Sequence, residues 1–124
     1  MNNIVNVWLN NIHFYSLRIA QMKNTQFKVN QFYNKNQFVF EWDWKTIFQS
    51  YDSTIAIIDY ENKTLTIWID WDYSKATSKH FYLFLSDYCF LHWFNKKAVL
   101  NLIKDWIFNY WYSEFKVIYD ENLR

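Results

Sequence analysis

The chain of 124 residues contains no glycine and no proline. Average usage of the two, about 12% together, would supply about 15 of them. Without glycine the chain has no P-loop, no dinucleotide-binding glycine fingerprint and no G-x-S-x-G nucleophile elbow, because each needs glycine where the backbone turns sharply or approaches a ligand. We therefore expect a protein that is not an enzyme and uses no cofactor.

Cysteine and long apolar runs are also scarce. The single cysteine, Cys89, excludes an internal disulfide and fits a reducing compartment. No apolar run approaches the roughly 18 residues of a membrane span, and no basic segment followed by a long apolar run indicates a secretory signal. These absences predict a cytoplasmic protein that does not contact a membrane.

Aromatic residues are abundant, with 8 Trp, 10 Tyr and 12 Phe in a chain that is 52% hydrophobic. This content is enough for one core, so residues 1–124 are predicted to form a single domain. The common residues Asn, Lys, Phe, Tyr and Ile have AT-rich codons, which indicates an AT-biased genome such as that of a phage or mobile element. Tryptophan does not follow from that bias, so its eight copies require a structural or binding role.

The clearest pattern in the chain is a β-hairpin over residues 53–73. Two runs rich in β-branched and aromatic residues flank a polar turn at residues 61–63. Because side chains alternate across a strand, Ile55 and Ile57 are expected to share a face of the first arm. In the second arm one face carries Leu65, Ile67, Ile69 and Trp71, and the other carries Thr64, Thr66, Trp68, Asp70 and Asp72.

A second hairpin is predicted from residues 26–33 and 37–44 around the turn Asn34-Lys35-Asn36, because asparagine tolerates the left-handed backbone that such turns need. In its second arm Phe38, Phe40, Trp42 and Trp44 share one face, while Val39, Glu41 and Asp43 share the other.

Two amphipathic helices are predicted, one near each end of the chain. The first covers residues 3–23, and its apolar stripe is Ile4, Trp8, Ile12, Tyr15, Ile19 and Met22. The second begins after the N-cap Asn95 and continues to about Tyr112. Between the hairpins and the last helix we expect a connection or helical turn at 46–51, a strand at 80–85 and a short helix at 86–94, with a last strand at 115–119. The prediction is an α+β fold, an antiparallel sheet of four to six strands packed against an N-terminal and a C-terminal helix.

Charge is distributed unevenly along the chain. Residues 1–40 contain four basic and no acidic residues, whereas residues 41–74 contain seven acidic residues and two lysines. The acidic block coincides with the predicted sheet. The acids there either keep an aromatic sheet soluble or form a face that binds a basic partner.

We expect the second role, a protein-binding inhibitor whose sheet face blocks the basic surface of a partner, with a nuclease as the expected class. Trp68 would be its central anchor, because tryptophan dominates interface hot spots. In size and composition the chain resembles the small single-domain inhibitors of phages and toxin loci, the anti-CRISPR and immunity proteins. The predicted partner-binding residues are Glu41, Asp43, Trp68, Asp70 and Asp72, with Phe108 and Trp111 on the last helix as the alternative surface.

Two other functions stay open. Lysines interleaved with aromatic rings can bind single-stranded nucleic acid, and the candidates around the 26–44 hairpin are Arg18, Lys23, Lys28, Phe32, Tyr33 and Lys35. A metal-dependent nuclease would instead need converging carboxylates, which the pairs Glu41-x-Asp43, Asp59-x-Glu61 and Asp70-x-Asp72 could supply. Cys89 and His92, three residues apart, are expected to pack rather than catalyse, and no metal site is predicted.

Overall fold

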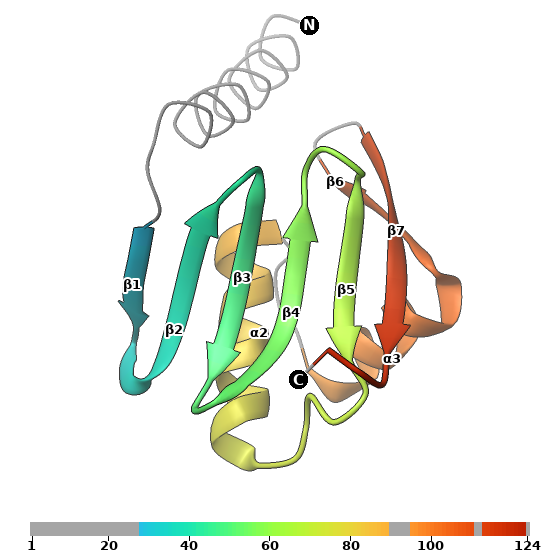
Figure 1. Ribbon diagram of the computed structural model, residues 1–124. Coiled ribbons are helices and arrows are strands. Elements are labelled where there is room, and N and C mark those ends of the chain that lie inside the picture. The colour runs from blue at the N-terminus through green and yellow to red at the C-terminus, as the bar shows by residue number, and fades with distance from the viewer. Residues whose placement is uncertain (1–27, 90–94, 111–112, 124) are drawn as a thin grey trace, which may run out of the picture.

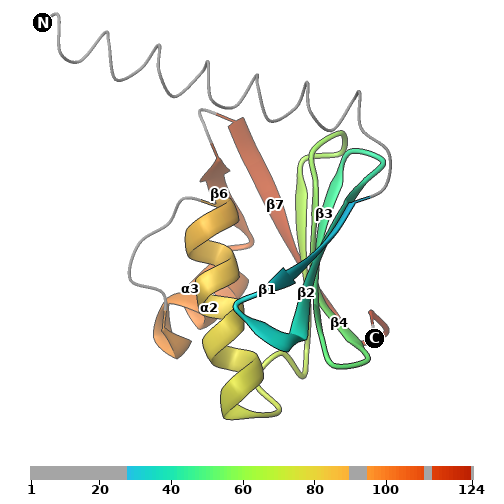
Figure 2. The same ribbon diagram turned by 90° about the vertical axis from the view of Figure 1, so that its left-hand side faces the viewer.

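The computed structural model describes residues 28–89, 95–110 and 113–123, which form one sheet with two helices against it (Figures 1 and 2). The strands are β1 (Lys28–Phe32), β2 (Asn34–Trp42), β3 (Lys45–Ser50), β4 (Ser53–Asp59), β5 (Thr64–Trp68), β6 (Ile107–Tyr110) and β7 (Ser113–Asp120), and the helices are α2 (Lys75–Cys89) and α3 (Lys96–Asp105). The α+β class is confirmed. The expected helix at 3–23 lies outside the described residues.

Within the described part of the chain the sheet has seven strands, in the order β1-β2-β3-β4-β5-β7-β6, where four to six were expected. Strands β1 to β5 follow one another as antiparallel neighbours, and the predicted hairpin of β4 and β5 is confirmed. After β5 the chain crosses over through α2, α3 and β6, so that β7 pairs with β5 in parallel. The sheet is therefore mostly antiparallel with one parallel pair.

Both helices lie on one side of the sheet, as Figure 2 shows. We call this side the helix face and the opposite side the open face. On the helix face Phe48 of β3 is fully buried, and its ring stacks on Phe81 and Phe84 of α2 with centroid distances of 6.3 and 5.3 Å. The core thus forms between the sheet and α2.

Helix α2 corrects two expectations, the strand at 80–85 and a short helix beginning at Ser86. The Ser74 hydroxyl accepts a hydrogen bond from the Thr77 N–H at 3.1 Å, which caps the first turn of α2. The buried residues of α2 then recur with helical spacing: Thr77, His80, Phe81, Phe84, Leu85 and Cys89. A short apolar run does not distinguish a strand from a helix. The features that indicate a helix here are the cap at Ser74 and the helical spacing of the buried residues along the whole of α2.

The last helix is shorter than expected. Its predicted cap is confirmed, since the Asn95 side chain accepts a hydrogen bond from the Ala98 N–H at 2.9 Å. The helix ends at Asp105 because Trp106 adopts a left-handed conformation with φ 64°, and its N–H donates to the Leu102 carbonyl. Residues 107–110, expected to be helical, instead form β6 against β7.

In β2 the face that carries Val39 and Glu41 was expected to be the outward, partner-binding one, and the structure shows the reverse. Gln37 and Val39 are buried on the helix face, whereas Phe38 and Phe40 are half-buried on the open face and Trp42 is 55% exposed. Alternation predicts which residues share a face, but not which face receives the helices.

Strand β3 occupies residues expected to form a connection or helical turn, and its pairing with β4 contains a β-bulge. Phe48 is opposite Ala56, but the next residue, Gln49, is opposite Thr54, so Ile55 is the extra residue. The bulge places Ile55 in the core while Ile57 lies on the open face. The expectation that these two isoleucines share a face is therefore wrong.

The turns use left-handed residues other than glycine. Tyr33 alone links β1 to β2, so the expected turn at Asn34-Lys35-Asn36 is wrong and those residues begin β2. Among the residues that the structure describes, those with positive φ are Tyr33, Asp43, Trp44, Tyr51, Lys63 and Trp106. A left-handed non-glycine residue costs roughly 1–2 kcal/mol, so packing and hydrogen bonds of the surrounding structure must hold these turns.

Candidate functional site

The hairpin topology separates the acids that were expected to form one surface. The β2–β3 and β4–β5 turns lie at the upper end of the sheet in Figure 1, whereas the β3–β4 turn and the β5–α2 loop lie at the lower end. Asp43 belongs to the upper end, and Asp70 and Asp72 belong to the lower end. A seven-residue strand such as β4 separates the two ends by roughly 20 Å. The expectation of a single acidic face is therefore wrong.

Glu41 of β2 does not lie on the open face of the sheet. It pairs with Thr46 in the β2–β3 register, and the Thr46 side chain is fully buried on the helix face. Residues directly opposite in an antiparallel pair share a face. Glu41 therefore lies on the helix face rather than beside Asp70.

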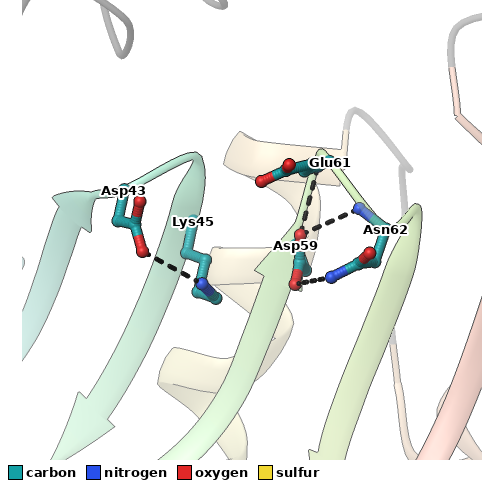
Figure 3. Close-up of polar contacts among 5 residues, drawn as sticks. All are labelled: Asp43, Lys45, Asp59, Glu61 and Asn62. Atoms are coloured by element: carbon teal, nitrogen blue, oxygen red, sulfur yellow. Dashed lines mark hydrogen bonds and ion pairs between the residues drawn. The ribbon is translucent and has the colours of Figure 1, made fainter.

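At the upper end the carboxylates of Asp43 and Asp59 interact with groups of the same chain (Figure 3). The Asp43 carboxylate lies 3.5 Å from the Lys45 ammonium. The Asp59 carboxylate accepts hydrogen bonds from the N–H groups of Glu61 at 3.1 Å and Asn62 at 3.0 Å, and from the Asn62 side-chain amide at 2.9 Å. These carboxylates therefore hold turns together.

The stability that the Asp59 carboxylate gives to the β4–β5 turn is expected to depend on pH. Burial by itself would raise the pKa of the Asp59 carboxyl, but the hydrogen bonds from Asn62 and Glu61 and the charge of Lys45 together outweigh it, so the pKa is lowered. A lowered folded-state pKa means that the stabilisation is present above the ordinary pKa and is lost as the pH falls through the folded-state value.

Replacing Asp59 with alanine is expected to lower the free energy of unfolding by about 1 kcal/mol at pH 7, the size of a lost side-chain cap on backbone N–H groups. Urea unfolding of Asp59→Ala and wild type measures this, and the difference should shrink as the pH is lowered below about 4. Glu61→Gln is the control, because the N–H rather than the side chain of Glu61 contacts Asp59. An equal loss in Glu61→Gln would contradict the assignment.

The lower end of the sheet carries a depression with a volume of about 330 Å³. It is lined by residues of the β3–β4 turn, the first residue of β4, the last residue of β5 and the β5–α2 loop. We call it the acidic pocket, and its lining residues are Tyr51, Asp52, Ser53, Trp68, Asp70 and Tyr73. Two of the five predicted partner-binding residues, Trp68 and Asp70, are thus brought together.

The expected role of Trp68 as an exposed anchor is wrong, because its side chain is only 7% exposed. Its ring makes an edge-on contact with the ring of Tyr73 at a centroid distance of 5.9 Å. The exposed rings of the acidic pocket are instead Tyr51 at 46% and Tyr73 at 48%. Trp68 therefore forms the wall of the pocket, and the two tyrosines form its accessible surface.

Sequence reasoning missed Tyr51, Asp52 and Tyr73. The segment 46–51 was expected to be a connection, so the pair Tyr51-Asp52 was not recognised as the turn between two strands. The φ of 54° at Tyr51 and the hydrogen bond from the Gln49 side-chain amide to the Tyr51 carbonyl at 2.8 Å define that turn. The sequence feature that could have indicated this part of the site is the pair of an aromatic and an acidic residue, Tyr51 and Asp52, directly before the central hairpin.

Hydrogen bonds fix the loop that carries Asp70 and Tyr73. The Trp71 N–H donates to the Trp68 carbonyl and the Tyr73 N–H donates to the Asp70 carbonyl, each at 3.0 Å. Ile69 anchors the loop to β7, because its N–H donates to the Asp120 carbonyl at 3.1 Å. These backbone hydrogen bonds therefore hold Asp70 and Tyr73 in the lining of the acidic pocket.

The carboxylates at the lower end differ in their partners. Asp72 lies 3.5 Å from the Lys96 ammonium, whereas Asp52 and Asp70 have no ion pair within the described part of the chain. Burial raises the pKa of the Tyr119 hydroxyl, and the charges of Asp72 and Asp70 raise it further. Among the described residues, Asp52 and Asp70 are thus the carboxylates of the acidic pocket, and neither forms an ion pair there.

A family model matches residues 18–99. The chain belongs to a family of unknown function, DUF8033. The DUF8033 match includes β1 to β5, all of α2 and the first residues of α3, so it contains every residue that lines the acidic pocket. The chain has no significant match among curated proteins and none among solved structures.

The residues proposed for single-stranded nucleic acid do not form an aromatic platform. Phe32 is 7% exposed and packs edge-on against Phe48 at 5.9 Å, so its ring belongs to the core. Tyr33 is exposed, but its hydroxyl donates to the Asp87 carboxylate at 2.7 Å, which brings negative charge beside it. Lys35 is exposed, whereas Arg18, Lys23 and the side chain of Lys28 are not described.

The other chemical candidates are also separated or lie outside the described residues. Within residues 28–89, 95–110 and 113–123 no three His, Cys, Asp or Glu side chains lie close enough to hold a metal ion. Cys89 is buried in α2, and His92 and Trp111 are not described. Phe108 pairs with Phe115 in the sheet, which places it in a strand and not on a helix. In the described part of the chain, no helix is both long and apolar enough to cross a membrane.

Proposed function

We propose that this DUF8033 protein is a non-enzymatic protein-binding inhibitor, of the anti-CRISPR or toxin-immunity kind, that captures a basic side chain of its partner in the acidic pocket. The partner class is a protein with a basic surface, with a nuclease as the expected example. The interface is the lower end of the sheet. Of the residues first expected to bind, Asp70 remains central, whereas Glu41 and Asp43 lie elsewhere.

The observation that carries this proposal is the pairing of two carboxylates with two accessible aromatic rings in one depression. Within the described residues Asp52 and Asp70 form no ion pair, and Tyr51 and Tyr73 are about half exposed. An arginine side chain can donate to carboxylates while its planar guanidinium lies against an aromatic ring. The ring contact contributes about 0.5–2 kcal/mol, depending on desolvation.

Such a pocket would inhibit a nuclease by holding a basic side chain that the nuclease needs to bind nucleic acid. A nuclease binds phosphate groups through lysine and arginine side chains, and neutralising these contacts removes much of its affinity for nucleic acid. An arginine held in the acidic pocket is unavailable to a phosphate. Charge complementarity across the interface also accelerates association.

The test is a titration of the full chain, labelled for NMR, with blocked tri-arginine peptide, following the resonances of Tyr51, Tyr73 and the Trp68 indole N–H. We expect saturable shifts confined to the acidic pocket that weaken as salt is added. A tri-citrulline peptide is the matched control, because citrulline has nearly the shape of arginine without its charge. Equal shifts with both peptides, or shifts only at other surfaces, would contradict the proposal.

A further inference from the structure

Ser53 lines the acidic pocket with a side chain that has no partner in the described part of the chain. It is the first residue of β4 and is only 7% exposed. Two other serines at the lower end have hydroxyl partners, since Ser50 shares a hydrogen bond with Thr77 at 2.8 Å and Ser74 donates to Thr77 at 3.0 Å. The Ser53 hydroxyl has none among the described residues. A nearly buried polar group of this kind usually bonds water or a ligand.

The acidic pocket presents hydrogen-bond acceptors from two loops. Asp52 directly precedes Ser53 at the β3–β4 turn, whereas Asp70 belongs to the β5–α2 loop. Strands β4 and β5 are antiparallel neighbours, so the start of β4 lies beside the end of β5. Two carboxylates and one hydroxyl, all able to accept hydrogen bonds, therefore line one depression. The residues that the structure places in this lining include no lysine, arginine or histidine.

We propose that the acidic pocket is selective for guanidinium over other cationic groups and that Ser53 is a specificity-determining residue. Because it specifies which basic group the pocket takes, this selectivity rests on the proposed function. The charge of Asp52 and Asp70 alone would attract any cation. The preference must therefore come from the arrangement of the acceptors and from the aromatic rings.

The number and spread of donors distinguish guanidinium from ammonium. A guanidinium carries five N–H groups that point outward in one plane, whereas an ammonium carries three on a single nitrogen. The planar group can donate to acceptors on different sides of the pocket at once, to Asp52 and Asp70 as well as to Ser53. In a depression of about 330 Å³, a point-like ammonium in contact with one carboxylate reaches fewer of these acceptors.

The aromatic rings favour the same ligand. Tyr51 and Tyr73 are half-exposed, and Trp68 forms the wall of the pocket. A guanidinium is more weakly hydrated than an ammonium and stacks its flat face on such rings. A quaternary ammonium would also be attracted to the rings. It has no N–H group, however, and would leave the Ser53 hydroxyl and both carboxylates without a donor.

Ser53 contributes to the selectivity through the cost of an unpaired hydroxyl. A ligand that fills the pocket displaces water from this hydroxyl, which then needs a hydrogen bond from the ligand. Where the ligand supplies none, the desolvation of the hydroxyl is uncompensated, and a site built to hydrogen-bond its ligand rejects analogues that lack the matching group. Ser53→Ala removes this acceptor without adding a charge or filling the pocket.

The test compares blocked tri-arginine and tri-lysine peptides in NMR titrations of the full chain. We expect the wild-type protein to bind tri-arginine about tenfold more tightly, the effect of one hydrogen bond to a charged group. Ser53→Ala should remove most of this preference by weakening the binding of tri-arginine. Ser113→Ala is the matched control, because Ser113 begins β7 at the upper end of the sheet (Figure 1), and it should keep the wild-type preference.

Three results would overturn the inference. They are equal affinities of the wild-type protein for the two peptides, an unchanged preference in folded Ser53→Ala, and tighter binding of a tri-(trimethyl-lysine) peptide than of tri-arginine. The wild-type affinities decide the selectivity even if Ser53→Ala fails to fold. The absence of binding by all of these peptides would be a different result, because it would contradict the proposed function itself and the selectivity with it.

Discussion

Phe48→Ala is expected to lower the free energy of unfolding by about 3–5 kcal/mol, the range for phenylalanine removed from a packed core. Phe48 is fully buried in β3 and stacks on Phe81 and Phe84 of α2. The ring of Phe32 of β1 also contacts it edge-on, at a centroid distance of 5.9 Å. The substitution therefore leaves a cavity where β1, β3 and α2 meet, and a loss of this size is a substantial part of the 5–15 kcal/mol that is typical of a folded domain.

Urea unfolding followed by circular dichroism measures this effect. Leu100→Ala is the control, because Leu100 is 47% exposed on α3 and its truncation leaves no comparable cavity. A loss below about 1 kcal/mol for Phe48→Ala, no larger than that of Leu100→Ala, would contradict the packing of α2 on the sheet.

If the proposed function holds, reversing the charge of both Asp52 and Asp70 to lysine is expected to weaken binding of the proposed basic partner by about 2–5 kcal/mol, the cost of disrupting a desolvated charge pair. This corresponds to a loss of affinity from about thirtyfold to more than a thousandfold. The physical reason is that the partner's arginine would meet two ammonium groups in place of two carboxylates. Calorimetric titration of the folded variant with the partner measures the change.

Asp43→Lys supplies the matched control. Asp43 is an exposed carboxylate like Asp70, but it lies at the upper end of the sheet and pairs with Lys45. Wild-type affinity in Asp43→Lys together with wild-type affinity in the double variant would place the interface away from both ends. An equal loss in both would show a long-range charge effect without a specific pocket.

Local patterns in the sequence were sufficient for several elements. The hairpin of β4 and β5 follows from β-branched residues around a polar turn, and the start of α3 follows from the capping side chain of Asn95. Each depends on neighbours within a few residues, so no knowledge of the remaining fold was required. The α+β class follows from the same local patterns.

The helix α2 shows where such patterns become ambiguous. The run from His80 to Leu85 is short and largely apolar, and either a strand or a helix would bury it. The tertiary structure decides for a helix because Phe81 and Phe84 then reach Phe48 across the helix face together. The strand β6 was not predicted, because the tryptophan at position 106 gave no indication that the helix ends there in a left-handed conformation.

The sequence by itself determined the hairpin turn at residues 61–63, the cap at Asn95 and the acidic character of residues 41–74. The tertiary structure alone decided which face of β2 is covered, because that depends on where α2 packs. It also decided that Tyr51 and Asp52 meet Asp70 and Tyr73, since an antiparallel meander brings the end of β5 beside the start of β4. For the same reason Asp43 lies a strand length away. Proximity across strands depends on register and on strand direction, and neither is visible in the order of residues along the chain.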